Sequence, residues 1–307
     1  MNGPFLIMIA ASLWAADSLI RAKLTNAIPS TAIVFYEHLF AFAILSPLFI
    51  KSFKKFKQLT RKDWALLLLL TIVSSVLGTV LFTESFARSA ITFDFATPVL
   101  LLKLQPAFVV TLSVIFLREK VNIKFIGLAL LATIGSYMIS FGTEKIPIEL
   151  EGKQLIFILA IGAAFCWGAG TILSKTVLKK LTYFEATVLR FMLAIPVSFL
   201  FMIAMKDTYS PLDLDINQVL RFLFIAISTG AVSILIYYKG LQKTPARIST
   251  IAELAFPVVS ILIAITSLNP FGSPQTLSLA NIFGIVILLI SILLISFDYG
   301  KKETKEK

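Results

Sequence analysis

Four ionisable residues lie deep inside long apolar stretches of this sequence: Glu37, Lys103, Arg190 and Glu253. Placing a charge at the centre of a bilayer costs ~2.5 kcal/mol or more, so charges that persist there usually mark substrate or ion pathways. Counting residues at the rise of an α-helix puts Glu37 level with Lys103, and Arg190 level with Glu253. We therefore expect two layers of opposite-sign pairs, which either line a pathway or act as structural ion pairs between helices.

Other polar and aromatic side chains extend this candidate pathway. They are Trp14, Asp17, His38, Gln105, Trp167 and Tyr237. The two tryptophan rings offer π faces to a cationic or aromatic ligand, although packing within a bundle explains them equally well. An unperturbed histidine titrates near neutral pH, which makes His38 a candidate proton carrier, but a lone histidine is more often a packing residue. Asp17 precedes Arg21 by four residues, as Glu84 precedes Arg88, and this spacing favours local ion pairs. Tyr237 contributes a hydroxyl to the pathway or anchors a helix at the interface.

Two prolines, Pro106 and Pro257, interrupt apolar stretches in the two halves of the chain. A proline lacks the N–H that would bond to the carbonyl four residues earlier, which here is the carbonyl of Leu102 or of Glu253. A freed carbonyl within a membrane needs a neighbouring helix, water or a ligand as its partner. Either proline alone would indicate a packing kink, but the matched pair favours a functional helix break.

The elements that would position these residues are membrane-spanning helices. Hydrophobic residues make up 58% of the 307 residues and charged residues only 15%, whereas soluble domains carry about 25% charged residues. The apolar residues form runs of about 20, the length of a helix that crosses a bilayer. We predict an all-α membrane protein with ten spans: 4–20, 31–50, 64–83, 96–117, 123–141, 154–173, 184–205, 218–238, 248–268 and 278–297. The charged tail, residues 300–307, is expected to lack fixed structure.

The basic residues predict the orientation of these spans. Apart from Lys103 and Arg190, 19 lysines and arginines fall on one side of the ten-span arrangement and seven on the other. The positive-inside rule then places both termini in the cytoplasm of a multi-pass protein of the inner membrane. The net charge of +11 is explained by this asymmetry and by anionic lipids rather than by a nucleic acid partner.

Few residues are available for a metal, a disulfide or a nucleotide. Cys166 is the only cysteine and His38 the only histidine, so the sequence offers neither an internal disulfide nor zinc-ligand spacing. The GxxxxGK[ST] motif of ATP-binding loops is missing from the sequence. We therefore expect no metal and no cofactor, and energy from a gradient of substrate or ion.

An internal repeat is indicated when the sequence is shifted by 153 residues, which lays Trp14 on Trp167. Pro106 and Pro257 then fall in corresponding spans, and Gly127 is expected to correspond to Gly284. Each half, 1–142 and 143–299, holds five spans, so the second is inserted upside down relative to the first. Inverted repeats with broken helices at matching positions are typical of secondary transporters, whose substrate sites lie near the midplane.

Several segments resemble the EamA-type transporters of the drug/metabolite transporter superfamily, over essentially the whole chain. They are LQPAFVVTLSVIFLREK (104–120), CWGAGTILSK (166–175), LRF (189–191) and YYKGLQKTPARISTIAELAFPVV (237–259). Two departures stand out. Glu37 and His38 occupy the place of an Arg-Phe pair that the family often has in its second helix. The stretch NPFGSPQ (269–275) replaces an acidic residue expected after the ninth helix.

The resemblance implies transport of a small molecule, and family members move amino acids, nucleotide-like metabolites, amines or toxic compounds. We predict a secondary transporter, not an enzyme, working by alternating access in the bilayer as a monomer or homodimer. A coupling proton or an exchanged metabolite would supply the energy. The alternatives are a channel, which needs a pore lined by polar rings, and a lipid-modifying enzyme, which needs a clustered catalytic constellation.

Overall fold

The computed structural model describes residues 2–25, 27–92, 96–142, 153–207, 209–210, 213–267, 274 and 276–305. Within these ranges the chain is helical and contains no strand. Among the described residues, nine helical stretches, some of them built from two or three consecutive elements, are long and apolar enough to cross a membrane. The expected first span is also a helix, α1 (Gly3–Leu24), but its apolar part is shorter, Gly3–Ala16. The prediction of an all-α membrane protein is thus confirmed.

The elements of the first half of the chain are α1, α2 (Ser30–Phe56), α3 (Arg61–Leu70), η1 (Thr71–Leu77), α4 (Gly78–Thr92), α5 (Ala96–Leu102), α6 (Gln105–Leu117) and α7 (Ile123–Phe141). The elements of the second half are α8 (Gln154–Val177), α9 (Tyr183–Ala204), α10 (Ile216–Ile225), η3 (Ala226–Val232), α11 (Ser233–Gln242), α12 (Ala246–Ala252), α13 (Ala255–Ala264) and α14 (Leu279–Lys305). The tail was expected to lack structure, but α14 continues as helix to Lys305.

Side-chain caps fix where several helices begin. Thr60 and Asp63 form a capping box at the start of α3, and Asp215 and Gln218 form one at the start of α10. Each box satisfies backbone N–H groups that the first helical turn leaves without partners. Beyond these starts, α3 and α10 both continue into a π-helical segment of seven residues, η1 and η3, and then into α4 and α11. The third and eighth expected spans therefore share one construction.

The fourth and ninth expected spans share another construction. α5 and α12 are both seven-residue helices, and each is followed by two residues in a turn and then by a longer helix, α6 or α13. In the first break Lys103 N donates to Leu100 O at 3.0 Å, and in the second Leu254 N donates to Ile251 O at 3.1 Å. These bonds span three residues instead of the four of an α-helix, so the turn is tightened at each break.

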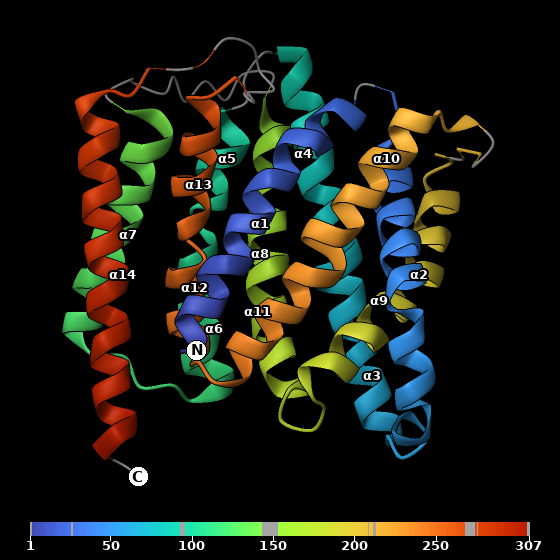
Figure 1. Cartoon of the computed structure of the whole chain (residues 1–307), viewed down its shortest axis with the longest axis horizontal. Helices are drawn as coiled ribbons and strands as arrows, with labels where there is room; N and C mark the ends of the chain where they lie inside the picture. Colours follow the sequence, from blue (N-terminus) through green and yellow to red (C-terminus); the bar gives the residue numbers. More distant parts are fainter. Residues whose placement is uncertain are drawn as a thin grey trace.

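The packing of the helices pairs elements from opposite halves. α1 packs against α11 and α13, and α8 packs against α4 and α6. α2 lies against α9, and α7 lies against α14 (Figure 1). Figure 1 shows α7 and α14 at one edge of the bundle and α2 and α9 toward the other. Each half therefore completes its core with helices of the other half.

A glycine contact fixes the distance between α7 and α14. A Cβ added at Gly284 would lie 2.8 Å from the carbonyl oxygen of Gly135, and one added at Gly135 would lie 2.9 Å from that of Gly284. Only glycine permits so close an approach of two backbones. Gly127, expected to correspond to Gly284, would meet nothing within 4 Å. That correspondence within the repeat stays a prediction, and Gly135 is the glycine that contacts Gly284 across the helix pair.

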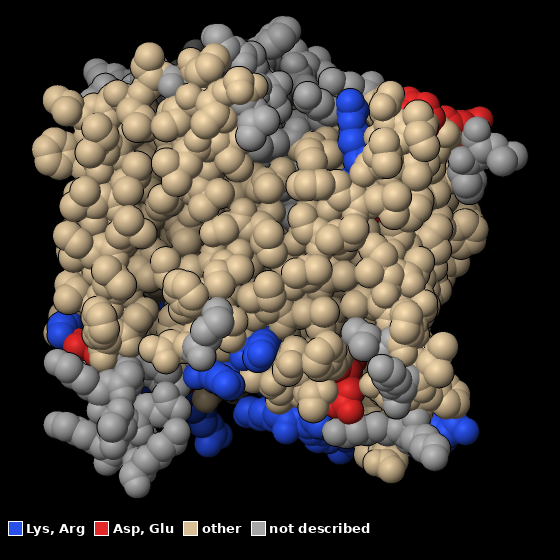
Figure 2. Space-filling model, viewed as in Figure 1, with Lys and Arg blue, Asp and Glu red and all other residues tan. Residues whose placement is uncertain are grey.

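The surface supports a membrane environment. Large apolar side chains are widely exposed, for example Ile115 at 61%, Leu200 at 65% and Phe283 at 60%, whereas soluble monomers rarely expose extended apolar patches. Figure 2 shows a broad band of uncharged surface on one face of the molecule, with lysine and arginine gathered below it. In Figure 1 both chain ends lie toward this basic end.

Candidate functional site

Glu253 lies in the break between α12 and α13 and binds two neutral donors. Tyr237 of α11 donates its hydroxyl to Glu253 Oε1 at 2.8 Å, and Gln105 at the start of α6 donates its amide to Oε2 at 3.0 Å. Among the described residues no lysine or arginine pairs with this carboxylate. The second break is thus connected to the beginning of the helix that follows the first break.

Trp14 completes an aromatic and polar cluster around Tyr237. Its ring centroid lies 5.2 Å from that of Tyr237, and its indole N–H donates to the Ser233 hydroxyl at 2.9 Å. The Tyr237 hydroxyl also lies 3.2 Å from Thr171 Oγ1 of α8. Helices α1, α8 and α11 therefore converge on Glu253, and they bring three predicted site residues, Trp14, Tyr237 and Glu253, into one place.

Arg190 of α9 does not pair with Glu253, so the expected inner-layer pair was wrong. Its guanidinium donates to Ser75 at 2.6 Å, to Ser74 at 3.1 Å and to the Tyr238 hydroxyl at 2.8 Å. The residues that contact Arg190 belong to η1 and α11, which pack against α9. Equal depth and opposite sign did not reveal the partner, because neighbouring helices supply hydroxyl groups within closer reach.

Glu37 pairs with Arg21 rather than with Lys103, so the expected outer-layer pair was also wrong. Arg21 Nη2 lies 2.8 Å from Glu37 Oε2, and the two side chains are only 6% and 10% exposed. Arg21 Nη1 also donates to Thr83 at 3.4 Å. This contact ties α1 to α2 and α4. We interpret it as a buried structural ion pair, since each charge has its partner within the protein.

Lys103 lies directly after α5, in the first break, and is partly buried. Its side chain makes no hydrogen bond or ion pair with any residue that the structure describes. Its position contrasts with that of Glu253, whose two oxygens are both bonded. A partly buried ammonium to which the described residues offer no polar partner is a candidate contact for a ligand.

Trp167, another predicted residue, has a packing role. Its ring centroid lies 5.0 Å from that of Phe82. It also lies against Gly78, where an added Cβ would be 2.8 Å from the indole.

His38 also has a packing role. It is buried, its ring nitrogen Nδ1 lies 2.7 Å from the Val34 carbonyl oxygen, and its ring centroid lies 5.4 Å from that of Phe191. The side chain of Asp17 lies outside the described residues. The predicted Glu84–Arg88 ion pair is present at 2.8 Å.

The sequence reasoning missed the hydroxyl residues of this region. Ser74, Ser75, Thr171, Ser233 and Tyr238 contact the predicted residues. Attention to ionisable groups alone passed over them, because isolated hydroxyls are common in membrane helices. One signal was available: Thr171 and Ser174 recur at helical spacing on α8, and Ser174 contacts Tyr238 at 3.0 Å. Paired hydroxyls on one helix face inside an apolar run indicate a polar surface.

Charged residues also fasten the basic end of the molecule. Glu119 accepts hydrogen bonds from the backbone amides of Ala246 at 2.7 Å and Arg247 at 3.0 Å, at the first turn of α12. Lys175 donates to the carbonyls of Leu241 at 2.5 Å and Thr244 at 2.6 Å. The turn between α11 and α12 is thereby held to α8 and to the segment after α6.

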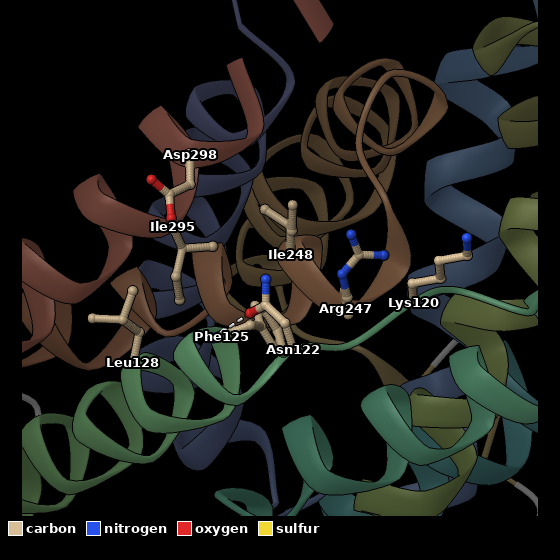
Figure 3. A pocket seen from close by; sticks show the side chains of 8 residues that line it. All are labelled: Lys120, Asn122, Phe125, Leu128, Arg247, Ile248, Ile295 and Asp298. Carbon is tan, nitrogen blue, oxygen red and sulfur yellow. Dashed lines mark hydrogen bonds between the residues drawn. The ribbon is translucent and has the colours of Figure 1, made fainter. Parts of the chain in front are cut away.

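A shallow pocket opens at the same end, between α7, α12 and α14. It is lined by Lys120, Asn122, Phe125, Leu128, Arg247, Ile248, Ile295 and Asp298 (Figure 3). Two of the charges are already paired, because Arg247 contacts Glu119 at 3.2 Å and Asp298 contacts Lys124 at 2.6 Å. The pocket includes none of the predicted site residues. We therefore take the two helix breaks, with Lys103 and Glu253, together with Arg190 and its hydroxyl partners as the candidate functional site.

Comparisons with known proteins point to one group. The sequence pattern described as the EamA-like transporter family matches residues 1–141 and 154–297. The Riboflavin transporter ImpX of Fusobacterium nucleatum is 28% identical over 300 residues, covering 96% of this chain and 98% of that protein. The uncharacterized transporter YetK of Bacillus subtilis is 26% identical over 294 residues, covering 94% of this chain and 87% of that protein. A solved crystal structure aligns over 94% of both chains with a TM-score of 0.73 at 12% identity, a likeness of fold alone.

Proposed function

The chain belongs to the EamA-like transporter family, and from this premise we propose that it is a secondary transporter that moves a small metabolite across the cytoplasmic membrane by alternating access. The observation that carries the proposal is the pair of broken helices, α5–α6 and α12–α13, each with an ionisable residue at its break. Discontinuous helices of this kind form substrate sites in secondary transporters.

The proposal includes ten spans arranged as two inverted repeats, residues 1–142 and 143–299, with α1 as the first span. Matching constructions support the repeat: the breaks in α5–α6 and α12–α13, and the π-helical segments η1 and η3. Reciprocal packing supports it as well, since α1 lies on α11 and α13 as α8 lies on α4 and α6. A two-fold relation in the membrane plane would produce these reciprocal contacts.

The substrate site in this proposal lies between the repeats, where Glu253, Tyr237, Gln105, Trp14 and Arg190 converge from five different segments. The charged groups of Glu253 and Arg190 are held by hydroxyl and amide groups, and polar groups of a substrate would replace these partners. Rocking one repeat against the other would open the site to each side in turn. The fastened turn at the basic end, held by Glu119 and Lys175, would then open when the site faces the cytoplasm.

Riboflavin is the first compound to test, because a relative of similar length carries that name. Its flat ring system suits the aromatic pairs Trp14–Tyr237 and Trp167–Phe82, and its hydroxyl chain suits the hydroxyls and amides near them. Amino acids, nucleotide-like metabolites and amphiphilic amines complete the panel. The direction of transport and the coupling ion are to be measured with the same preparation.

The test is uptake by liposomes that contain the purified protein. We expect saturable uptake of one panel compound, and a loss of tenfold or more in the initial rate for Glu253→Gln, since a charge-assisted hydrogen bond is worth ~1.5–3 kcal/mol. Glu84→Gln is the matched control, because Glu84 lies outside the cluster and pairs with Arg88. Uptake that is unaffected by Glu253→Gln would contradict this placement of the site.

Two alternatives are distinguished by the same preparation. Currents through planar bilayers that pass ions at channel rates would indicate a channel, and turnover of labelled lipid would indicate a lipid-modifying enzyme. Sedimentation in detergent separates a monomer from a homodimer. Saturable uptake without current or lipid turnover is the result expected of a secondary transporter.

The proposed orientation places both termini in the cytoplasm, supported by the basic end near both termini. In a Cys166→Ser background, a cysteine at Ser52 should resist an impermeant thiol reagent in intact cells. A cysteine at Asp213 should react with the same reagent. Labelling of the Ser52 position from outside would reverse the orientation.

A further inference from the structure

The two helix breaks carry opposite charges at equivalent positions. Lys103 is the residue directly after the seven-residue helix α5, and Glu253 is the residue directly after the seven-residue helix α12. A leucine follows in both cases, Leu104 or Leu254. The next residue begins the second helix of the pair, and it is Gln105 in one half and Ala255 in the other. The backbone of the two breaks has the same form, but the side chains at matching positions differ in charge and polarity.

The surroundings of the two breaks are equivalent as well. Trp14 packs on Tyr237 with ring centroids 5.2 Å apart, and Trp167 packs on Phe82 with centroids 5.0 Å apart and a similar tilt. Phe82 follows η1 at the same interval at which Tyr237 follows η3. α5 packs against α8, which carries Trp167, and against α4, which carries Phe82, as α12 packs against α1 and α11. Each broken helix therefore lies against the two helices that carry one of the aromatic pairs.

The two breaks differ in the hydrogen-bond partners of their charged side chains. In the second break, Glu253 receives hydrogen bonds from Tyr237 and Gln105. In the first break, Phe82 and Ala255 stand at the equivalent positions and neither has a polar side chain. Lys103 consequently makes no side-chain contact of this kind with the residues that the structure describes. In the part of the chain that the structure describes, polar groups bind the charge at the second break and none binds the charge at the first.

We propose that the substrate carries an acidic group, a carboxylate or a phosphate, attached to a flat ring, and that Lys103 binds the acid while Phe82 and Trp167 pack against the ring. This assignment rests on the proposed transport function and names its substrate class. The ammonium supplies up to three donors to an anion. The start of α6, a helix of 13 residues, adds the positive end of its dipole beside Lys103. An acidic substrate thus occupies the place that protein groups fill at Glu253.

The experiment measures binding to the purified full-length protein by the shift of its thermal unfolding midpoint. The probes are phenylacetate and indole-3-acetate, their uncharged amides, the corresponding amines phenethylamine and tryptamine, and phenyl phosphate. Sodium acetate controls for an anion without a ring. Because a ligand that binds only the folded state raises the midpoint, the order of the shifts reports the order of affinities. We expect the ring acids to give the largest shifts, the amides smaller shifts and the amines the smallest.

Lys103→Met should lower the apparent affinity for the ring acids about tenfold or more, the loss of one charge-assisted hydrogen bond, and bring acids and amides to the same level. Lys103→Arg should keep part of the preference for the acid. Lys120→Met, at the basic end and outside the site, is the matched control and should leave the preference unchanged. If phenyl phosphate raises the unfolding midpoint more than phenylacetate does, the substrate is a phosphate. If phenylacetate raises it more, the substrate is a carboxylate.

The assignment is overturned if acids and amides bind alike, if no ring acid binds, or if Lys103→Met keeps the preference for the acid. Uptake by liposomes separates this outcome from failure of the proposed function. Transport of a neutral or cationic compound that ignores Lys103 would leave the transport function in place and remove the acid contact. Binding of ring acids through Lys103 without transport of any compound would support the acid contact and contradict the proposed transport function.

Discussion

The breaks at Lys103 and Glu253 have the same backbone form, but they differ in whether the charged side chain has hydrogen-bond partners. In the second break, α11 and α6 supply a hydroxyl and an amide to the carboxylate. In the first break, the described residues supply no such partner to the ammonium. Two helix breaks of the same backbone form can thus differ in whether the described residues bind the charge that each break carries. The comparison teaches that function can be located by asking which of two equivalent charges lacks a protein partner.

A second pair of equivalent positions follows the same logic. Glu37 on α2 and Arg190 on α9 occupy the same place in the two helices that lie against each other. Glu37 is bound to the cation Arg21, whereas Arg190 is bound to the neutral hydroxyls of Ser74, Ser75 and Tyr238. An ion pair resists rearrangement more than contacts with hydroxyls do, so we assign Glu37 to stability and Arg190 to the pathway.

The largest effect should come from breaking the buried ion pair. Arg21→Met leaves Glu37 charged and buried without its cation, and we expect unfolding free energy to fall by ~3–5 kcal/mol. The measurement is unfolding in detergent micelles. The double variant Arg21→Met with Glu37→Met should recover most of the loss. Arg88→Met, at a partly exposed pair, should cost no more than ~1 kcal/mol. Additive losses in the double variant would contradict the pairing.

A smaller effect is expected at Tyr237, whose hydroxyl contacts both Glu253 and Thr171. Tyr237→Phe makes the second break resemble the first and should cost ~1.5–3 kcal/mol, because it removes a hydrogen bond to a charged group. Unfolding in micelles measures this loss. Tyr183→Phe serves as the control, since Tyr183 lies at the start of α9, away from Glu253. Equal stability of Tyr237→Phe and the parent protein would show that the Glu253 carboxylate gains nothing from the hydroxyl.

The glycine contact between α7 and α14 should give an effect of ~1–3 kcal/mol for Gly284→Ala, since the added methyl overpacks a close backbone contact. Gly127→Ala is the matched control. It adds a methyl to the same helix pair where nothing lies within 4 Å, and it should be neutral or stabilise by ~0.5–1 kcal/mol. Thermal unfolding of both variants tests the close contact between Gly135 and Gly284. Similar losses in both variants would refute it.

The smallest effect on stability belongs to Phe82→Tyr, which gives the first break the hydroxyl that the second one has. We expect unfolding free energy to change by ~0.5 kcal/mol or less, because Phe82 is only partly buried. The informative measurement is the preference for phenylacetate over its amide. A hydroxyl beside Lys103 should weaken that preference, and an unchanged preference would argue against the equivalence of the two breaks.

The sequence predicted the helical membrane fold because apolar length and helix geometry are local properties. The contact partners of individual side chains were harder to predict, because they depend on which helices become neighbours. Arg21 binds Glu37 through the contact between α1 and α2, a partner that spacing along a single helix did not reveal. Arg190 was matched to Glu253 by depth, yet η1 and α11 supply nearer hydroxyls. Depth fixes the level of a side chain in the membrane but does not fix its direction around the helix axis.

The reciprocal packing of α1 and α8 has a consequence for biosynthesis. α1 leaves the ribosome first, but the helices on which it packs, α11 and α13, are among the last to be made. Trp14 and Arg21 on α1 are therefore inserted early. The Ser233 hydroxyl that accepts from the Trp14 indole becomes available only when α11 is made. A nascent chain that stops after α7 lacks the helices that cover α1. Fragments that correspond to the two halves should be degraded when made alone and accumulate when made together.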